Sequence, residues 1–402
     1  MNYDNRSVKA REDRDVLSRL WFCMVEKETK IVGIRRFLRR LKRTHLSKSD
    51  LLRRSAVRCI MEEKYGMLVR KMKKILVIGT GGTIASKPTE SGLAPALSAE
   101  DLLEAVPYAA KICEVECAQA FSLDSTNVRP GHWLLLANLI REKYGEYDGF
   151  VITHGTDTLA YTAAGLSFLI QNSEKPIVLT GAQKPMGEDI SDAKQNLTDA
   201  LTYAADDESH NVCVVFNGSV IAGTRARKNY SKNFAAFVSV NFPYLAQIQD
   251  HRIIRYFPDP ANGKTQFYNY IDPNVGLLKL TPGMNNNLMR YALDCYDGIV
   301  IESFGVGGLP EYSDYFEQVK EAGNAGKFIV MTTQVPNEGS DLSVYKVGAV
   351  VKNSLKILEA HDMTSEAVLA KLMWVLGQIN DFTEAKFLFF RPVHHDILCR
   401  EG

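Results

Sequence analysis

Four side chains that follow apolar segments have the types needed for an acyl-transfer reaction: Thr83, Thr156, Asp157 and Lys184. A threonine hydroxyl is a weak nucleophile until a base removes its proton. A lysine that is neutral through burial is such a base, so we predict that Lys184 draws a proton from Thr156. Asp157 is predicted to position the lysine and a cationic amino group of a substrate. Backbone N–H groups in glycine turns are predicted to stabilise an oxyanion.

The first of these threonines stands in a glycine-rich turn after an apolar run. Ile75–Ile78 has the length and β-branched content of a strand that is buried on both faces. Gly79, Gly81 and Gly82 then allow a tight backbone turn before Thr83. The turn matches neither a dinucleotide-binding fingerprint nor a P-loop. This segment alone leaves two alternatives open. The turn either has a purely structural role or exposes Thr83 at the edge of the sheet for catalysis.

The design of strand, turn and helix recurs along the chain. Tyr147–Thr153 is predicted to be a strand that leads to Thr156 and Asp157, and Pro176–Gly181 a strand that leads to Lys184. Because the carboxyl ends of parallel strands meet at one edge of a sheet, these side chains are predicted to meet there. The alternatives are that Asp157 only caps a helix and that Lys184 is a surface residue.

Two polar segments flank this predicted edge. Ser122–Asn127 follows the predicted strand Val115–Phe121, and it either binds a small polar ligand or forms the entry to a helix over Pro130–Tyr144. Lys87–Pro95 is rich in turn-forming residues, which predicts a flexible loop. This loop is either a lid over the site or an ordinary surface connection.

The second half of the chain predicts another, smaller α/β unit. A segment without periodicity, Asp259–Asn274, collects Pro, Gly and Asn and is interpreted as the domain boundary. Predicted strands and helices alternate beyond it, and Ser365–Gln378 is predicted to be an amphipathic helix. The predicted fold is therefore α/β, with a larger N-terminal parallel-sheet domain at residues 72–262 and a smaller C-terminal domain at residues 263–402. The expected strands of the smaller domain are Val275–Leu280, Gly298–Glu302 and Lys327–Thr332.

Charge divides the 402 residues into two pieces. Residues 1–71 contain 20 Lys and Arg against 9 Asp and Glu, whereas residues 72–402 contain 28 against 38. The first piece is predicted to be a basic extension, helical or weakly ordered, that could contact RNA, acidic lipid or an acidic protein. The sequence contains neither a membrane-span-length apolar run nor a secretory signal, so a cytoplasmic location is predicted.

Cysteine and histidine usage predicts no metal site. The seven cysteines are scattered and are interpreted as reduced thiols without a disulfide framework or structural zinc. His394 and His395 form the only histidine pair, and they are interpreted as part of a surface loop.

Two segments resemble the signatures of the bacterial-type L-asparaginases. Thr80–Ala85 is similar to the first signature of that family and Asp148–Thr158 to the second. The resemblance extends from Met72 nearly to the C-terminus and does not include residues 1–71. Within the family, the chain resembles the type I, cytoplasmic members. In the lid segment many members have a tyrosine where this chain has Leu93.

The resemblance implies a role for each candidate residue. Thr83 matches the nucleophile that forms a β-aspartyl ester and releases ammonia before water regenerates the enzyme. Thr156, Asp157 and Lys184 match the other catalytic residues. The substrate is implied to be bound by Asp124, Ser125, Thr126, Thr156 and Asp157. The family also implies no cofactor or metal, and a homodimer or homotetramer.

Three functions are compatible with these residues. The leading hypothesis is an L-asparaginase that hydrolyses L-asparagine to L-aspartate and ammonia. The second is the amide-hydrolysing subunit of a tRNA-dependent amidotransferase, which usually has a β-rich N-terminal module, whereas residues 1–71 have helical spacing. Nucleic-acid binding is for this reason not expected. The third is a non-enzymatic amino-acid sensor.

Overall fold

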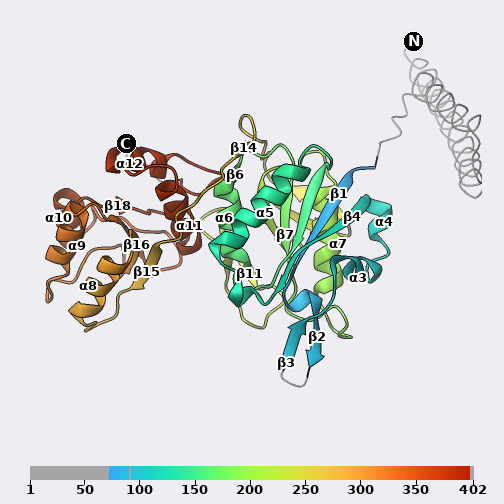
Figure 1. The fold of residues 1–402 in the computed structure, drawn as a ribbon, viewed down its shortest axis with the longest axis horizontal. Helices are drawn as coiled ribbons and strands as arrows, with labels where there is room; N and C mark the ends of the chain where they lie inside the picture. The colour runs from blue at the N-terminus through green and yellow to red at the C-terminus, as the bar shows by residue number, and fades with distance from the viewer. Residues whose placement is uncertain (1–71, 90–91, 399–402) are drawn as a thin grey trace, which may run out of the picture. The chain divides into compact units, whose positions relative to one another are not determined.

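The computed structural model describes residues 72–89 and 92–398. The predictions made for residues 1–71 lie outside the described residues. In Figure 1 the described chain runs through a large sheet flanked by helices and then through a smaller sheet with helices of its own. This arrangement confirms the predicted α/β fold with a larger N-terminal and a smaller C-terminal sheet.

The large sheet has eight strands, and its central strands are parallel. The chain order of β1, β5, β7 and β8 places the carboxyl ends of these strands at one edge, as predicted for successive strand, turn and helix units. From one side to the other the strands are β13 (Arg252–Arg255), β12 (Ala246–Gln249), β9 (Ser219–Ala222), β8 (Val212–Phe216), β7 (Ile177–Thr180), β5 (Gly149–Thr153), β1 (Lys74–Gly81) and β4 (Glu114–Leu123).

Alternating side chains of the central strands pack against helices on both faces of this sheet. Leu76 and Ile78 belong to the core on one face, and Ile75 and Val77 to the core on the other. Such two-sided burial explains why these strands are continuous apolar runs in the sequence. The first face is covered by α5 (Pro130–Lys143) and α6 (Leu159–Leu169), the second by α3 (Ala99–Glu104), α4 (Ala109–Ile112) and α7 (Ala193–Ala204).

One side of the large sheet is antiparallel, which the sequence analysis did not predict. After β8 the chain turns back at Asn217 (φ 49°) and Gly218 (φ 73°), and β9 pairs antiparallel with β8. Asn-Gly with positive φ at both positions is the preferred two-residue hairpin connection. β9 accordingly begins at Ser219, directly after this turn, and ends at Ala222.

The smaller sheet is parallel and packs on helices at both faces. Its strands are β15 (Val275–Lys279), β16 (Gly298–Ser303), β17 (Phe328–Thr333) and β18 (Leu358–Glu359). Its helices are α8 (Asn286–Cys295), α9 (Tyr315–Asn324) and α10 (Lys346–Ser354) on one face, and α11 (Ser365–Leu376) and α12 (Phe382–Phe390) on the other.

Helix α11 joins the cores of the two sheets. It packs on β15 and β16 and also on α6 of the large-sheet unit. All its residues except Leu369 are buried, including Lys371, so the predicted amphipathic pattern is wrong although the helix itself is confirmed. Lys371 is tolerated there because its ammonium group pairs with Asp396.

The segment predicted as a flexible loop beside the first turn forms a hairpin instead. β2 (Ser86–Thr89) pairs antiparallel with β3 (Gly92–Pro95). The loop was predicted from the turn-forming residues of this segment, but its two halves form backbone hydrogen bonds with each other and are extended. Across residues 72–89 and 92–398, no helix combines the length and apolarity needed to cross a membrane.

Candidate active site

Three turns at the carboxyl edge of the large sheet are in direct contact. Gly82 has φ 76° and ψ −179°, and a Cβ atom there would lie 2.3 Å from Cα of Gly155. A Cβ atom on Gly155 would in turn lie 2.6 Å from Oγ of Ser125. Only glycine permits this approach, so the turns of Thr83, Ser125 and Thr156 meet at one place.

Thr83 begins the short 3₁₀ helix η1 (Thr83–Ala85) immediately after this contact. The turn before it is fixed by the N–H of Gly82, which donates to the carbonyl of Leu123 at 2.9 Å. Oγ of Ser86 donates to the carbonyl of Gly82 at 2.9 Å. Thr83 itself stays partly exposed.

The turn after β4 is held by its own aspartate. Oδ1 of Asp124 accepts from the N–H of Thr126 at 2.9 Å and from its hydroxyl at 2.7 Å. Ser125 is buried beneath, and its carbonyl accepts from the hydroxyl of Thr158 at 2.7 Å. Asp124 and Thr126 remain exposed beside the turn of Thr156.

Thr156 and Asp157 both contact a lysine that the sequence analysis did not select, Lys228. Nζ of Lys228 lies 2.8 Å from Oγ1 of Thr156 and 2.5 Å from Oδ1 of Asp157. The lysine side chain is 18% exposed and the aspartate 57% exposed. A hydroxyl, an ammonium group and a carboxylate therefore form one polar unit with an open side at Asp157.

The contact predicted between Lys184 and Thr156 is not formed, which corrects that prediction. Nζ of Lys184 lies 3.0 Å from Oε2 of Glu188, and the Lys184 side chain is 50% exposed. The carboxylate of Asp192 accepts from the N–H groups of both Gln183 and Lys184. With the backbone held in this way, Gln183 contacts Thr156 and Lys184 extends to the surface.

Gln183 is the second residue that the sequence analysis missed. Oγ1 of Thr156 donates to Oε1 of Gln183 at 3.2 Å, and Nε2 of Gln183 donates to the carbonyl of Asn233 at 3.1 Å. Gln183 therefore links Thr156 to the chain beyond β10 (Ala226–Lys228), the short strand that ends with Lys228.

Lys228 gave little signal in the sequence. It ends a three-residue strand paired with β11 (Phe237–Ser239), and it follows Arg225 and Arg227 in a basic run. Such a run is usually a solvated surface. Only the packing of β10 against α6 brings its last residue to the turn of Thr156.

A buried histidine supports the turn of Thr156 from behind. Nδ1 of His154 donates to the carbonyl of Gly155 at 2.7 Å, so Nε2 accepts from the hydroxyl of Thr162 at 3.0 Å. Burial lowers the pKa of His154 to about 4, although the bond to Gly155 opposes this change. His154 is neutral at physiological pH and serves as a support for the turn.

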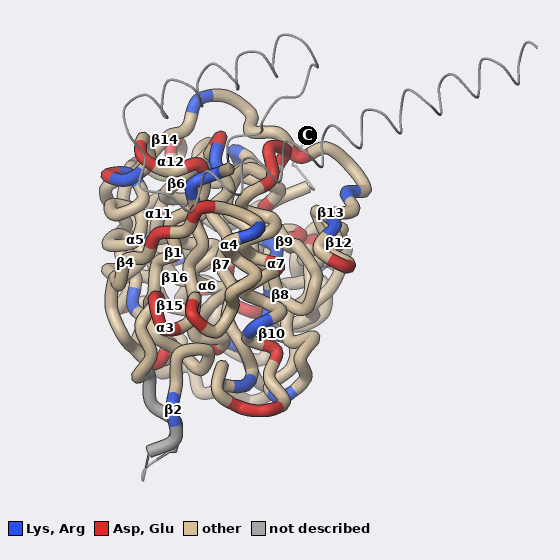
Figure 2. Tube along the Cα trace, turned by 90° about the vertical axis from the view of Figure 1, so that its right-hand side faces the viewer, with Lys and Arg blue, Asp and Glu red and all other residues tan. Residues whose placement is uncertain are grey.

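The described part of the chain has charges of both signs throughout. In Figure 2 acidic and basic positions are interspersed among the elements. The sequence of residues 72–402 contains ten more acidic than basic residues. This distribution does not resemble the basic surface typical of nucleic-acid-binding proteins.

Comparisons with known proteins match the part of the chain that holds the site and the part that follows it. The family model described as "Asparaginase, N-terminal" matches residues 74–260, and the model described as "Glutaminase/Asparaginase C-terminal domain" matches residues 274–389. The chain is 40% identical to an L-asparaginase of Thermococcus kodakarensis over 328 residues, covering 81% of this chain and 99% of that protein. The solved structure of the T. kodakarensis thermostable L-asparaginase covers 81% of this chain and 100% of its own, with a TM-score of 0.76.

Two further similarities bear on function and location. The chain is 36% identical to a glutamyl-tRNA(Gln) amidotransferase subunit of Pyrococcus furiosus, covering 79% of this chain and 75% of that protein. A structure of a probable cytoplasmic L-asparaginase from Campylobacter jejuni covers 79% of this chain and 99% of its own. It is 26% identical, with a TM-score of 0.69.

Proposed function

We propose that this chain, which belongs to the asparaginase family, hydrolyses L-asparagine to L-aspartate and ammonia. The observation that supports this proposal best is the contact of Lys228 with both Thr156 and Asp157, beside the turn of Thr83. The polar unit offers a proton-transfer pair and a carboxylate near Thr83, which is partly exposed. These are the groups that nucleophilic hydrolysis of an amide needs.

In the proposed reaction the hydroxyl oxygen of Thr83 adds to the side-chain amide carbon of asparagine. The hydroxyl proton of Thr83 is delivered to the amide nitrogen, which leaves as ammonia, and a β-aspartyl ester on Thr83 remains. Water then adds to the ester carbon and restores the free hydroxyl. Backbone N–H groups of the glycine turns stabilise the oxyanion in both steps.

We assign proton transfer to Thr156 and Lys228, and no longer to Lys184. The hydroxyl of Thr156 and Nζ of Lys228 are 2.8 Å apart, a distance at which a proton moves between two groups. Asp157 keeps the lysine in place from its other side.

Substrate binding is assigned to the exposed polar groups around this unit. The half-exposed carboxylate of Asp157 suits the α-ammonium group of an amino acid. The α-carboxylate is assigned to the turn of Asp124, Ser125 and Thr126, which contacts the turn of Thr156. Glutamine differs from asparagine by one methylene, for which a pocket discriminates by about 10–200-fold.

The proposal is tested by ammonia release from L-asparagine with purified wild-type, Thr83→Ala and Thr83→Ser proteins. Thr83→Ala is expected to lose at least about a thousandfold in kcat because the nucleophile is gone, and Thr83→Ser to keep measurable turnover. L-Glutamine and D-asparagine are assayed in parallel. Substantial ammonia release by Thr83→Ala would reject the proposed nucleophile.

The 36% identity to a glutamyl-tRNA(Gln) amidotransferase subunit supports a second candidate, in which amide hydrolysis serves a tRNA-dependent partner. The two functions differ in their requirements. An L-asparaginase releases ammonia from asparagine on its own, whereas amide hydrolysis within an amidotransferase requires the partner protein and tRNA. Full turnover by the isolated chain would exclude the second candidate.

We also propose a cytoplasmic location and a homodimer or homotetramer. The similarity to a probable cytoplasmic L-asparaginase supports the location. Exposed apolar side chains on α8 and before α9, at Leu288, Tyr291 and Tyr312, support self-association. Sedimentation velocity of the purified chain tests the oligomeric state, and a concentration-independent monomer would reject it.

A further inference from the structure

A second cluster of reactive side chains lies away from the turns of Thr83 and Thr156. Asp259 follows β13, and His394 and His395 follow α12. Nε2 of His394 lies 3.3 Å from Oδ2 of Asp259, and Nε2 of His395 lies 2.7 Å from Oδ1 of the same carboxylate. The pair that the sequence predicted as a surface loop is thus folded against a distant aspartate, and the His394 side chain is 7% exposed.

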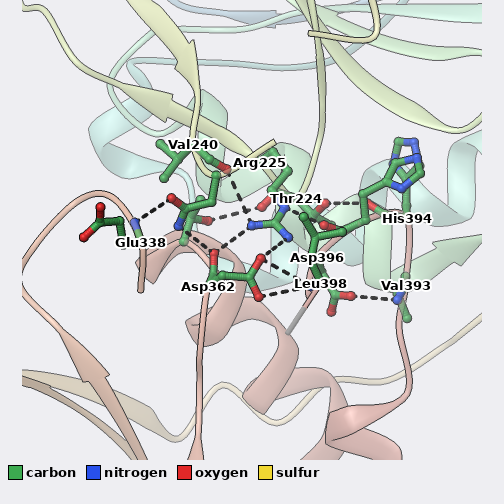
Figure 3. Close-up of polar contacts among 12 residues, drawn as sticks. Thr224, Arg225, Val240, Glu338, Asp362, Val393, His394, Asp396 and Leu398 are labelled. Atoms are coloured by element: carbon green, nitrogen blue, oxygen red, sulfur yellow. Dashed lines mark hydrogen bonds and ion pairs between the residues drawn. The ribbon is translucent and has the colours of Figure 1, made fainter. Parts of the chain in front are cut away.

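The backbone of the two histidines is fixed by residues of the large-sheet unit. Oγ1 of Thr224 donates to the carbonyl of His394 at 2.6 Å, and Nε of Arg225 donates to the carbonyl of His395. Figure 3 shows Thr224 and Arg225 beside the segment of His394. Both histidines have positive φ, 43° and 65°. Two successive non-glycine residues in this region persist only where the surroundings hold them.

The imidazole and carboxylate groups are also oriented. The ring of His395 stacks on that of Phe242 with centroids 4.3 Å apart. Each carboxylate oxygen of Asp259 faces the Nε2 atom of one of the two imidazoles, so the carboxylate is held on both sides.

Three ligand atoms, one from each residue, lie within 4.8 Å of one another. Ligand atoms about 2.0–2.1 Å from a tetrahedral zinc ion lie about 3.3 Å apart. The 3.3 Å between Nε2 of His394 and Oδ2 of Asp259 equals this spacing. The 2.7 Å between Nε2 of His395 and Oδ1 of Asp259 is that of a hydrogen bond, which an ion bound here would replace. Two imidazoles and one carboxylate are a donor set for zinc-type ions, whereas Mg²⁺ prefers oxygen ligands.

An open space next to the cluster leaves room for a fourth ligand. A pocket of about 420 Å³ is lined by all three residues together with Asn262 and Arg391. The guanidinium of Arg391 is held by other partners, since Nη2 donates to Oε1 of Gln171 at 3.0 Å. Solvent in this pocket supplies the water that completes a three-residue zinc site.

We propose that Asp259, His394 and His395 bind one divalent transition-metal ion of the zinc type, with water as the fourth ligand. The ion joins the segment after α12 to the segment after β13. Its binding therefore stabilises the attachment of the C-terminal segment to the large-sheet unit. This proposal does not depend on the function proposed for Thr83.

The test uses the untagged full chain, stripped with a chelator and titrated with Zn²⁺ by equilibrium dialysis. We expect one tight Zn²⁺ per chain that is weakened at least tenfold in Asp259→Asn and His395→Gln. The exposed His251, changed to Gln, is the matched control and is expected to bind as wild type. Co²⁺ is expected to give a tetrahedral visible spectrum without a thiolate charge-transfer band, which excludes binding at a cysteine.

Thermal unfolding with and without Zn²⁺ provides a second measurement in case one variant folds poorly. Zn²⁺ is expected to raise the Tm of the wild type and of His251→Gln, because an ion that binds only the folded state stabilises it. The Tm of His395→Gln, whose ring is 28% exposed in the wild type, is expected to shift much less with Zn²⁺. Mg²⁺ is expected to shift none of them. Unsaturable Zn²⁺ binding, or equal binding by wild type and both variants, would overturn the proposal.

Discussion

At the scale of single residues, Lys228 and Lys184 provide a direct comparison of two lysines near one site. Lys228 contacts Thr156 and Asp157, whereas Lys184 contacts Glu188 at the surface. We predict that Lys228→Met lowers kcat for asparagine by about 10²–10⁴-fold, because the proton-transfer partner of Thr156 is lost. Lys184→Met is predicted to change kcat less than threefold. Steady-state kinetics of both variants measures the difference, and the opposite ranking would return the role to Lys184.

His154 gives a prediction about pH at the same scale. Its pKa is about 4 in the folded protein and near 6.5 in an unfolded chain, so the unfolded state binds the proton more readily. The contribution of neutral His154 to the free energy of unfolding is therefore fully present above about pH 6.5. It is lost as the pH falls to about 4, which lowers the free energy of unfolding by about 3 kcal/mol.

The measurement is urea unfolding at pH 7 and pH 4. Between pH 7 and pH 4 the free energy of unfolding is expected to fall by about 3 kcal/mol more in the wild type than in His154→Asn, because the asparagine side chain does not titrate. The variant retains a donor that can reach the carbonyl of Gly155. Identical losses in the two proteins would show that His154 does not stay neutral in the folded state.

At the scale of elements, the contact between two glycine turns is the feature on which the site depends. Gly82 combines φ 76° with ψ −179°, a conformation that is essentially restricted to glycine, and its Cα faces Gly155. We predict that Gly82→Ala lowers the free energy of unfolding by at least about 3 kcal/mol and removes ammonia release.

Gly131 is the matched control for this substitution. It lies near the start of α5, and a Cβ atom there would meet nothing within 4 Å. Gly131→Ala is predicted to leave stability equal or raise it by up to about 1 kcal/mol. Chemical denaturation measures the free energy of unfolding of both variants. Equal values would mean that the two glycine turns can move apart without loss of stability.

At the scale of the whole described molecule, the two sheets are joined by a buried ion pair as well as by α11. Arg225, fully buried between β9 and β10, donates from Nη2 to Oδ2 of Asp362 and from Nη1 to its carbonyl, both at 2.7 Å. Figure 3 shows this pair with Leu398, whose N–H donates to Oδ1 of Asp362.

We predict that Arg225→Met costs about 3–5 kcal/mol of stability, because the Asp362 carboxylate then stays buried without its guanidinium partner. The double variant Arg225→Met/Asp362→Leu is predicted to cost less than the single one, since no unpaired charge remains. Denaturation midpoints measure both. The exposed pair of Lys143 and Glu146 is the control, and Lys143→Met is predicted to leave the midpoint unchanged.

The predicted boundary between residues 262 and 263 stays our proposal for the division of the chain. The two sheets lie on opposite sides of it in the sequence, with only the short strand β14 (Gln266–Phe267) between β13 and β15. The continuous core through α6 and α11 indicates that the two parts stabilise each other. Whether either part folds alone can be measured on the separate fragments.

The sequence by itself determined the central strands, their turns and the family. Runs such as Ile75–Ile78 are apolar because both sheet faces are covered, and turns such as Gly79–Thr83 need glycine for their backbone angles. Both causes are local, so both are visible in the order of residue types. The predicted fold class and family resemblance are confirmed for this reason.

Only the tertiary structure decided which side chains meet. Lys228 reaches Thr156 across 72 residues because β10 packs on α6, and Asp259 reaches His395 across 136 residues because the C-terminal segment binds the large-sheet unit. Periodicity records which face of an element is buried, but it does not record which distant element covers that face. The polar contacts that define both sites are therefore properties of the folded chain.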